Sequence, residues 1–381
     1  MCNPFPPIPI GVALSGNERY MQRDDQIDDL DKKLEECLRD QNSGLVNVVG
    51  LPLTGKTLLI DQWREKRAGE GSDTIVYISF DDFFMSRSNY CEKYLTIFRD
   101  ALPVSASELP FAKDEPCYKM EQLFREQWRR RFAKQHLFIV LDQFQEVVSA
   151  LESKKVGVDF LDMLFAPLME MGAVQQPSDG RLIYIVLDWE PLAKRKDESY
   201  WPSSIKDHVY FSNISVWHIP LLLPTQVESF LQIPEGGLKW LYSQPDMVSK
   251  WTAGHPAFVA WAGWLAYDHK QDEQDWSVFD PDKLDPYVRF YLADYCKALR
   301  ITEEERSAME VIARIFYEKC CDQPDEGIPV LALRGRVEDQ LINQLLVKKV
   351  LRKVRKMDGP PHLYFFFPLI ERALWMEQHS N

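Results

Sequence analysis

The pattern of hydrophobic and polar positions begins with a helical period and then alternates between two kinds of segment. Residues 23–40 place Ile27, Leu30, Leu34 and Leu38 on one face of a helix whose other face is charged. Four short apolar runs follow, at residues 44–50, 73–82, 136–142 and 181–188, and helical segments accompany them at residues 56–68, 90–102, 121–134 and 160–172. Short apolar strands that alternate with such helices predict an α/β fold, a parallel sheet with helices on both faces.

The pattern changes near residue 215. The following segment is helical and aromatic, as in WTAGHPAFVAWAGWLAYD at residues 251–268, and the last 80 or so residues suggest three helices, a strand (HLYFFF) and a final helix. That order suits a small winged-helix domain. We therefore expect an extended, proline-containing lead-in at residues 1–20, a P-loop ATPase core at 21–215, an α-helical lid at 216–299 and a winged-helix domain at 300–381.

Composition limits the classes of function. No run of the 381 residues approaches the length of a membrane span, and the N-terminus lacks a secretory pattern, so we expect a cytoplasmic protein without membrane contact. The seven cysteines are scattered and predict neither a disulfide framework nor a zinc site. A net charge of −13 argues against nucleic-acid binding by the whole surface, but the basic run KKVLRKVRK (Lys348–Lys356) leaves a local DNA contact open. The same run could instead be a solvated face or meet an acidic partner.

A phosphate-binding loop is the clearest chemical motif. GLPLTGKT at residues 50–57 satisfies G-x-x-x-x-G-K-[ST] between a predicted strand and a predicted helix. Its glycines let the backbone wrap closely around phosphates, whose charge is met by N–H groups and the start of the helix. We expect Lys56 to reach the β- and γ-phosphates and the Thr57 hydroxyl to ligate Mg²⁺.

Asp142 is the predicted acidic partner of this loop. It ends the apolar strand Leu137–Leu141, where an acidic residue on the neighbouring strand would hold the Mg²⁺ shell. The alternative is an aspartate that only caps the loop after the strand.

Together these motifs resemble the STAND branch of the AAA-like P-loop ATPases, which are nucleotide-dependent signalling switches. YMQRDDQIDDL with Arg23 is similar to the helix that covers the adenine in that family, FIVLDQFQ to its second nucleotide motif, AGHPAF to its lid signature, and YFFFPLIERAL to the end of its winged helix. The resemblance covers about residues 20–375 and implies ATP and Mg²⁺ as cofactors. The nucleotide-contacting residues would be Arg23, Gly50, Thr54, Gly55, Lys56, Thr57, Leu58 and Pro256, with Thr57 and Asp142 at the metal.

The chain departs from this family at the catalytic position. Gln143 follows Asp142, where relatives have the glutamate that polarises the attacking water. A glutamine can orient water by hydrogen bonds but cannot accept its proton as a carboxylate does. We therefore expect slow hydrolysis unless Glu146 or a neighbouring subunit supplies the base.

Two further positions also differ from the family pattern. Phe366 or Phe367 stands where relatives often have a histidine that senses the β-phosphate. An arginine that completes a neighbour's site would be Arg195 or be replaced by Lys206, and the sequence does not choose between them. Asp188, at the end of the fourth strand, is the polar residue available as a γ-phosphate sensor, although its charge would repel phosphate and a solvated turn is the alternative.

The resulting functional prediction is an ATP-binding switch that self-associates or engages a partner in a nucleotide-dependent way. Because the chain shows no nuclease, protease or repeat signature, the output is expected in a separate effector protein, as in a bacterial antiviral defence system. The first alternative is a DNA-processing AAA-type ATPase of the origin-recognition or transposition-regulator kind. The second is a structural subunit that binds ATP without hydrolysing it, which Gln143 favours.

Overall fold

The computed structural model divides into two compact units, which are described one at a time. The α/β unit contains residues 23–50 and 56–220, and the helical unit contains residues 221–381, with residues 51–55 grouped with it. The structure describes residues 23–39, 44–70, 73–81, 83–85, 90–101, 136–171, 180–195, 198, 201, 205, 207, 211, 213–233, 239–240, 244–269, 279–320, 327–355 and 361–379. The expected lead-in at residues 1–20 and the expected helix at residues 121–134 lie outside these ranges.

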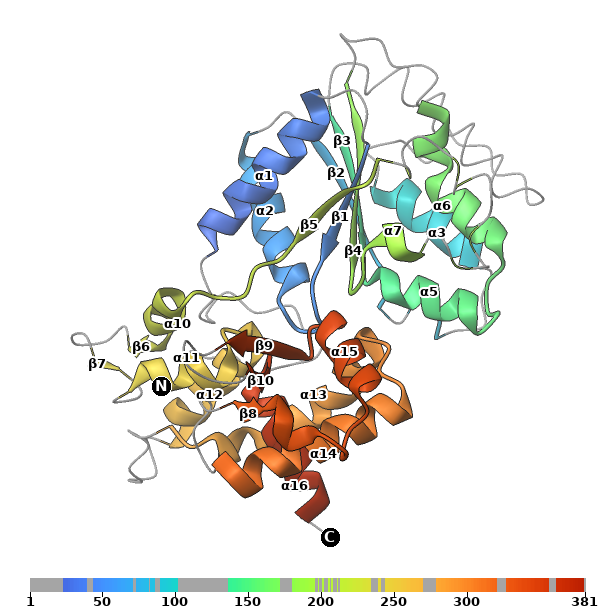
Figure 1. Ribbon diagram of the computed structural model, residues 1–381. Coiled ribbons are helices and arrows are strands. Elements are labelled where there is room, and N and C mark those ends of the chain that lie inside the picture. Colours follow the sequence, from blue (N-terminus) through green and yellow to red (C-terminus); the bar gives the residue numbers. More distant parts are fainter. Residues whose placement is uncertain are drawn as a thin grey trace. The chain divides into compact units, whose positions relative to one another are not determined.

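Among the described residues of the α/β unit, five strands form one parallel sheet in the order β2-β3-β4-β1-β5 (Figure 1). Their bounds are β1 (Leu45–Val49), β2 (Thr74–Ser79), β3 (Leu137–Asp142), β4 (Leu182–Asp188) and β5 (Ser215–His218). Val49 pairs with Asp188 and His218, and Ser79 pairs with Asp142, so the carboxyl ends of the strands share one edge. The predicted fold class, a parallel α/β sheet followed by a helical part, is confirmed.

Helices cover both faces of this sheet, because successive side chains of each buried strand point to opposite faces. In β3, Phe138 and Val140 pack on the face that carries α1 (Asp24–Arg39) and α2 (Lys56–Glu70), whereas Leu137, Ile139 and Leu141 pack on the other face. The second face is covered by α3 (Tyr90–Ala101), α5 (Phe144–Glu152) and α6 (Val158–Met171) (Figure 1). This alternation decides which face each residue at the carboxyl edge occupies.

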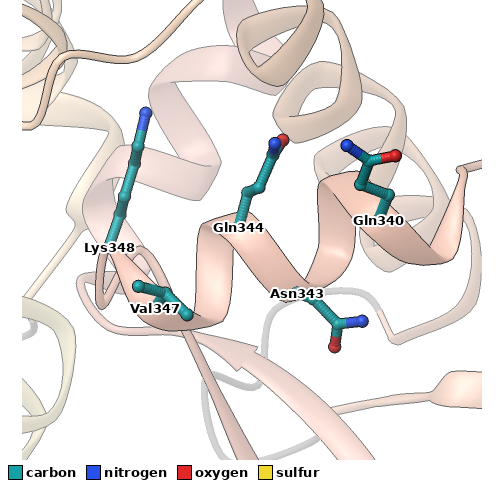
Figure 2. A pocket seen from close by; sticks show the side chains of 5 residues that line it. All are labelled: Gln340, Asn343, Gln344, Val347 and Lys348. Carbon is teal, nitrogen blue, oxygen red and sulfur yellow. The ribbon is translucent and has the colours of Figure 1, made fainter.

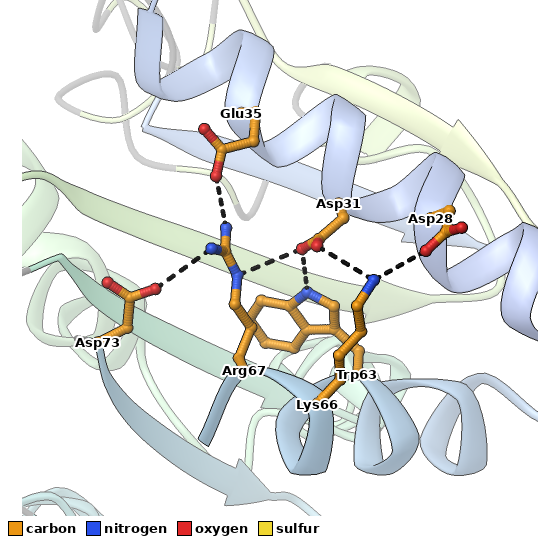
Figure 3. Close-up of polar contacts among 7 residues, drawn as sticks. All are labelled: Asp28, Asp31, Glu35, Trp63, Lys66, Arg67 and Asp73. Atoms are coloured by element: carbon orange, nitrogen blue, oxygen red, sulfur yellow. Dashed lines mark hydrogen bonds and ion pairs between the residues drawn. The ribbon is translucent and has the colours of Figure 1, made fainter. Parts of the chain in front are cut away.

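An ion-pair network joins α1 to α2 (Figure 3). The Arg67 guanidinium of α2 lies 3.2 Å from Asp31 and 2.8 Å from Glu35 of α1, and its third nitrogen lies 3.5 Å from Asp73. The Trp63 indole N–H donates to the same Asp31 carboxylate at 2.8 Å. The Arg67 side chain is mostly buried, so its pairs with Asp31 and Glu35 are screened less than fully exposed pairs are, and they hold α1 beside the helix that follows the phosphate loop.

The helical unit begins with α10 (Pro224–Leu231) and a short antiparallel pair, β6 (Gln232–Ile233) and β7 (Lys239–Trp240). It continues with α11 (Pro245–Thr252), α12 (Pro256–His269), a 3₁₀ turn η4 (Pro281–Leu284), and α13 (Asp285–Ala298). One hydrophobic core runs from Leu222 to Leu374 and so includes the C-terminal elements as well. The finer boundary between a lid and a last domain at residue 300 stays a prediction.

The C-terminal elements are α14 (Glu303–Cys320), β8 (Ile328–Pro329), a 3₁₀ turn η5 (Val330–Leu333), α15 (Asp339–Val347), β9 (Leu351–Arg355), β10 (Pro361–Phe365) and α16 (Pro368–His379). Among the described residues here, three strands form an antiparallel sheet in the order β8-β10-β9. This order of helices and strands is compatible with a winged helix. In the basic run, residues 351–355 form strand β9, which pairs with β10. No helix in the described ranges is long and apolar enough to cross a membrane.

The AGHP segment of the helical unit makes a close backbone contact with Leu222. Ala253 and Gly254 both have positive φ, and Gly254 accepts a hydrogen bond from the Leu222 N–H at 2.9 Å. A Cβ atom at Gly254 would lie 2.1 Å from the Leu222 carbonyl oxygen. His255, which we expect to be structural, is buried, and its Nε2 lies 3.1 Å from the Tyr291 hydroxyl.

We expect Gly254→Ala to destabilise the helical unit by about 2–4 kcal/mol, because it adds left-handed strain and a collision with backbone. Gly335→Ala is the matched control: Gly335 also has positive φ, but a Cβ there meets nothing within 4 Å. The control should therefore cost only about 1 kcal/mol. Urea unfolding of both variants measures the difference, and equal losses would contradict the role of close packing.

Candidate nucleotide site

The predicted phosphate loop lies at the carboxyl edge of the sheet, between β1 and α2. Leu53 and Gly55 adopt left-handed conformations, and the Thr54 hydroxyl donates to the Leu51 carbonyl at 2.8 Å. The Gly50 N–H donates to the Asp188 carbonyl at 3.2 Å, which joins the start of the loop to the end of β4. A tight turn followed directly by a helix N-terminus is an arrangement that can receive an anion.

Lys56 is a buried cation at the start of α2. Its ammonium group donates to the Gly50 carbonyl at 2.7 Å. Burial lowers the pKa of Lys56 to about 8, although the charges of Asp142 and Asp188 oppose that shift. A polyphosphate would favour the charged form of this lysine, because an adjacent negative charge offsets desolvation.

The Asp142 carboxylate accepts several hydrogen bonds in the site. Among the described residues, its Oδ2 accepts hydrogen bonds from the Thr57 hydroxyl at 2.7 Å and the Tyr77 hydroxyl at 2.5 Å. Its Oδ1 accepts from the Gln143 N–H at 2.7 Å. Asp142 is 1% exposed, whereas Thr57 is an exposed residue.

One detail of the expectation for Asp142 is wrong. β3 is not the neighbour of the strand that carries the phosphate loop, because β4 pairs with both. Asp142 and Thr57 nevertheless meet. Alternate residues of a strand point to the same face, so Asp142 points to the α1–α2 face together with Phe138 and Val140.

Gln143 has a strained backbone. It is a non-glycine residue with φ of 56° and ψ of 44°, and it is the N-cap of α5. Such a conformation costs of the order of 1 kcal/mol or more and tends to occur at functional sites. Glu146 lies in the first turn of α5, half-buried, and its N–H donates to the Gln143 carbonyl at 2.9 Å. Its role as an alternative base stays a prediction.

Arg195 does not fit the role of a residue that acts on a neighbouring subunit. It ends the short helix α7 (Leu192–Arg195), is buried, and pairs with Asp188 through two contacts of 2.8 and 2.9 Å. Asp188 does not fit a γ-phosphate sensor either. Side chains alternate along β4, so Asp188 points to the face that α7 covers, and its carboxylate is already paired with Arg195. Burial raises the pKa of Asp188, and Arg195 opposes that shift. Lys206 lies outside the described residues.

Arg23 lies just before α1 and is almost fully buried. Among the described residues, its Nε and Nη1 have no hydrogen-bond partner, and neither does Oε1 of Gln26, one turn further along α1. Burial lowers the pKa of Arg23 to about 10. Buried donors and acceptors of this kind are normally satisfied, so they are consistent with a polar ligand beside α1.

The remaining expected contacts have less specific surroundings. Leu58 is half-buried in the first turn of α2, and Pro256 is the first residue of α12 in the helical unit. Phe367, one of the two residues at the expected histidine position, is buried against His255 and Phe258, while Phe366 is half-buried. The contact of Pro256 with a base stays a prediction.

The donor set fits Mg²⁺ only together with a nucleotide. In the described part of the chain, no group of three or more His, Cys, Asp or Glu residues could hold a metal ion. Thr57 and Asp142 supply hard oxygen atoms, and Mg²⁺ commonly combines few protein ligands with substrate phosphates and water. These two residues could therefore hold Mg²⁺ with a triphosphate.

Tyr77 and Arg64 are site residues that the sequence motifs do not reveal. Tyr77 belongs to β2, and the Arg64 guanidinium of α2 lies 4.4 Å from the centre of its ring. The only hint in the sequence is the alternation of side chains along β2, which places Tyr77 on the same face as Ile75. That signal is useful only once the pairing of β2 with β3 is known.

Comparison with known proteins shows the fold. A Walker-type ATPase of Pyrococcus abyssi superposes with a TM-score of 0.50 at 13% identity, covering 93% of this chain and 96% of that one. Cdc6p from Pyrobaculum aerophilum gives 0.43 at 15% identity, covering 98% of both chains. The Orc1 protein of Aeropyrum pernix, solved in complex with DNA, gives 0.40 at 13% identity, covering 94% and 93%. No protein-family model matches the chain, and no curated protein matches it. The chain thus has the α/β P-loop NTPase fold with a helical C-terminal part.

We expect Arg195→Met to lower the free energy of unfolding by about 3 kcal/mol or more, because it leaves the buried Asp188 carboxylate without its cation. Lys194→Met is the matched control, since Lys194 is exposed in the same short helix. Chemical unfolding measures both. An Arg195→Met protein with unchanged stability but impaired self-association would restore the role in a neighbour's site.

Proposed function

We propose that this protein binds ATP with Mg²⁺ at residues 50–57 and works as an AAA-type P-loop ATPase whose hydrolysis is slow. The observation that carries the proposal is the hydrogen bond from the Thr57 hydroxyl to Asp142 at the carboxyl edge of the sheet. It joins the phosphate-loop helix to the acidic end of β3, which is the pairing that Mg²⁺–ATP binding requires. Buried Lys56 supports it further, as do the polar atoms of Arg23 and Gln26 that have no partner among the described residues.

In this proposal each residue has a limited task. Lys56 and the loop N–H groups hold phosphate oxygens, and Thr57 with Asp142 holds the metal, which would neutralise charge on the phosphates. Arg23 lies beside the base. Gln143 orients water through its amide but takes no proton, so the barrier to hydrolysis stays high.

We expect wild-type protein to bind ATP with Mg²⁺ and release phosphate slowly, and Gln143→Glu to release it at least about 10-fold faster. A glutamate of the same shape supplies the proton acceptor that the site lacks. Lys56→Ala should weaken nucleotide binding at least about 10-fold, because it removes the buried cation. Calorimetric binding and phosphate release measure the two effects.

Glu146→Gln is the control for an alternative base. If Glu146 accepts the proton, this variant loses the residual activity of the wild type. Fast wild-type hydrolysis that Gln143→Glu slows would contradict the proposal, since Gln143 would then be the better catalytic group. Wild-type protein that binds no nucleotide would refute it.

The coupling of nucleotide to output is less constrained. Self-association is compatible with the fold, and a switch needs contacts that differ between nucleotide states. A separate effector and a part in a defence system rest on the STAND resemblance and on the lack of nuclease, protease and repeat signatures in the sequence, and they stay predictions. A permanently bound, structural ATP is the other alternative that Gln143 favours.

DNA binding is the second candidate, and the surface of α15 favours it. A pocket on this helix is lined by Gln340, Asn343, Gln344 and Val347 and by Lys348, which follows the helix (Figure 2). Exposed amides can read adenine in a major groove, and Val347, 82% exposed, could contact a thymine methyl. Arg352 and Lys353 of β9 are exposed and could contact phosphates, as could Arg334 and Arg336 before α15.

The basic run at residues 348–356 offers fewer free positive charges than its sequence suggests. Lys348 donates to Glu305 and to the Arg300 carbonyl, both at 2.6 Å, so its charge is neutralised within the chain. Arg352 stacks over Tyr364 at 5.3 Å but stays exposed. The phosphate contacts would therefore come mainly from β9.

We expect Lys353→Ala to weaken binding of a DNA duplex and to lower the slope of log K against log salt by about 1, because one phosphate contact is lost. Lys155→Ala, which removes an exposed cation of the α/β unit, should change neither quantity. Fluorescence anisotropy over a salt series gives both. Equal effects of the two variants, or no binding by the wild type, would exclude this surface.

A further inference from the structure

Tyr77 makes a contact that nucleotide binding by the phosphate loop does not by itself require. Its hydroxyl donates to Oδ2 of Asp142 at 2.5 Å, alongside the Thr57 hydroxyl. Tyr77 pairs with Val140 across the sheet, two residues before Asp142, so alternate side chains bring it to the same face. This is the face that α2 covers.

The Tyr77 ring is held from the helix that carries Thr57. The Arg64 guanidinium of α2 lies 4.4 Å from the ring centre and is itself paired with Asp61 at 2.9 Å, one turn back on α2. A cation over an aromatic face is attractive and orients the ring. Tyr77 and Thr57 therefore approach the same carboxylate oxygen from β2 and from α2.

The hydrogen bonds leave Asp142 little freedom. A carboxylate has about four lone-pair positions, and three are used, by Thr57 and Tyr77 at Oδ2 and by the Gln143 N–H at Oδ1. The Thr57 hydroxyl has one proton, which points at Asp142, so its lone pairs are directed elsewhere. Fixing the carboxylate thus also fixes the direction in which Thr57 offers its oxygen.

We propose that Tyr77 is a positioning residue for the magnesium site, whose hydroxyl holds the Asp142 carboxylate in place and, through it, the Thr57 hydroxyl beside it. This inference rests on the proposed ATP function and extends it to a residue outside the nucleotide motifs. Tyr77 touches neither phosphate nor metal in this role. It acts only through Asp142.

The test is the affinity for Mn²⁺, used as a probe for Mg²⁺, at saturating non-hydrolysable ATP analogue. Tyr77→Phe should weaken Mn²⁺ binding about 10-fold, as is usual when an outer partner of a metal ligand is removed. Binding of the analogue in EDTA, without metal, should stay within about 2-fold of wild type, because Tyr77 meets only the acidic side of the site. Electron paramagnetic resonance of free Mn²⁺ measures the first quantity and calorimetry the second.

Two variants serve as comparisons. Tyr90→Phe removes another half-buried hydroxyl, one that donates to the Phe84 carbonyl, and should leave Mn²⁺ affinity unchanged. Arg64→Met frees the Tyr77 ring without removing its hydroxyl and should weaken Mn²⁺ binding less than Tyr77→Phe does. It also provides a second reading if Tyr77→Phe folds poorly.

The outcomes separate this inference from the proposed function. Equal Mn²⁺ affinity of Tyr77→Phe and wild type would overturn the role of Tyr77 while leaving ATP binding intact. Equal losses with and without metal would also overturn it, since they indicate a structural effect. Wild-type protein that binds no analogue would remove the proposed function and this inference with it.

Discussion

The site depends on one buried carboxylate that must be satisfied. Asp142 is almost fully enclosed, and an unpaired charge there would cost several kcal/mol. Its hydrogen-bond donors come from α2, β2 and the first residue after β3, so the carboxylate holds three parts of the α/β unit in one arrangement. Polar contacts at the carboxyl edge of the sheet therefore fix the start of α2, with Lys56 and Thr57. Apolar side chains of α2 pack on the face of the same sheet.

The two faces of the sheet divide the acidic residues at this edge into different roles. Asp142 emerges on the side of α2 and accepts a hydrogen bond from the hydroxyl of Thr57, an exposed residue. Asp188 emerges on the opposite side and is paired with Arg195 inside the protein. Strand ends that look alike in sequence thus contribute one functional candidate and one structural ion pair, because adjacent residues in a strand point in opposite directions.

The residues of the candidate site suit nucleotide binding better than ATP hydrolysis. In the proposed function Lys56, Thr57 and Asp142 would hold phosphate and metal, while Gln143 would offer an amide where a carboxylate would accept a proton. Gln143 also has a left-handed backbone, a conformation that costs free energy in a residue other than glycine. The proposed slow hydrolysis would suit a switch or a stable assembly.

The sequence alone determined the local features. These are the strand and helix periods, the phosphate loop, Asp142 at a strand end, and Gln143 at the position where the resembled family has a glutamate. These are properties of neighbouring residues, and so a single chain carries them. Only the tertiary structure decided that β4 lies between β1 and β3, that Arg195 is used internally, that Lys348 is neutralised by Glu305, and that Tyr77 reaches Asp142. Strand order and side-chain partners depend on how distant segments pack, and hydrophobic period is the same for every order of the strands.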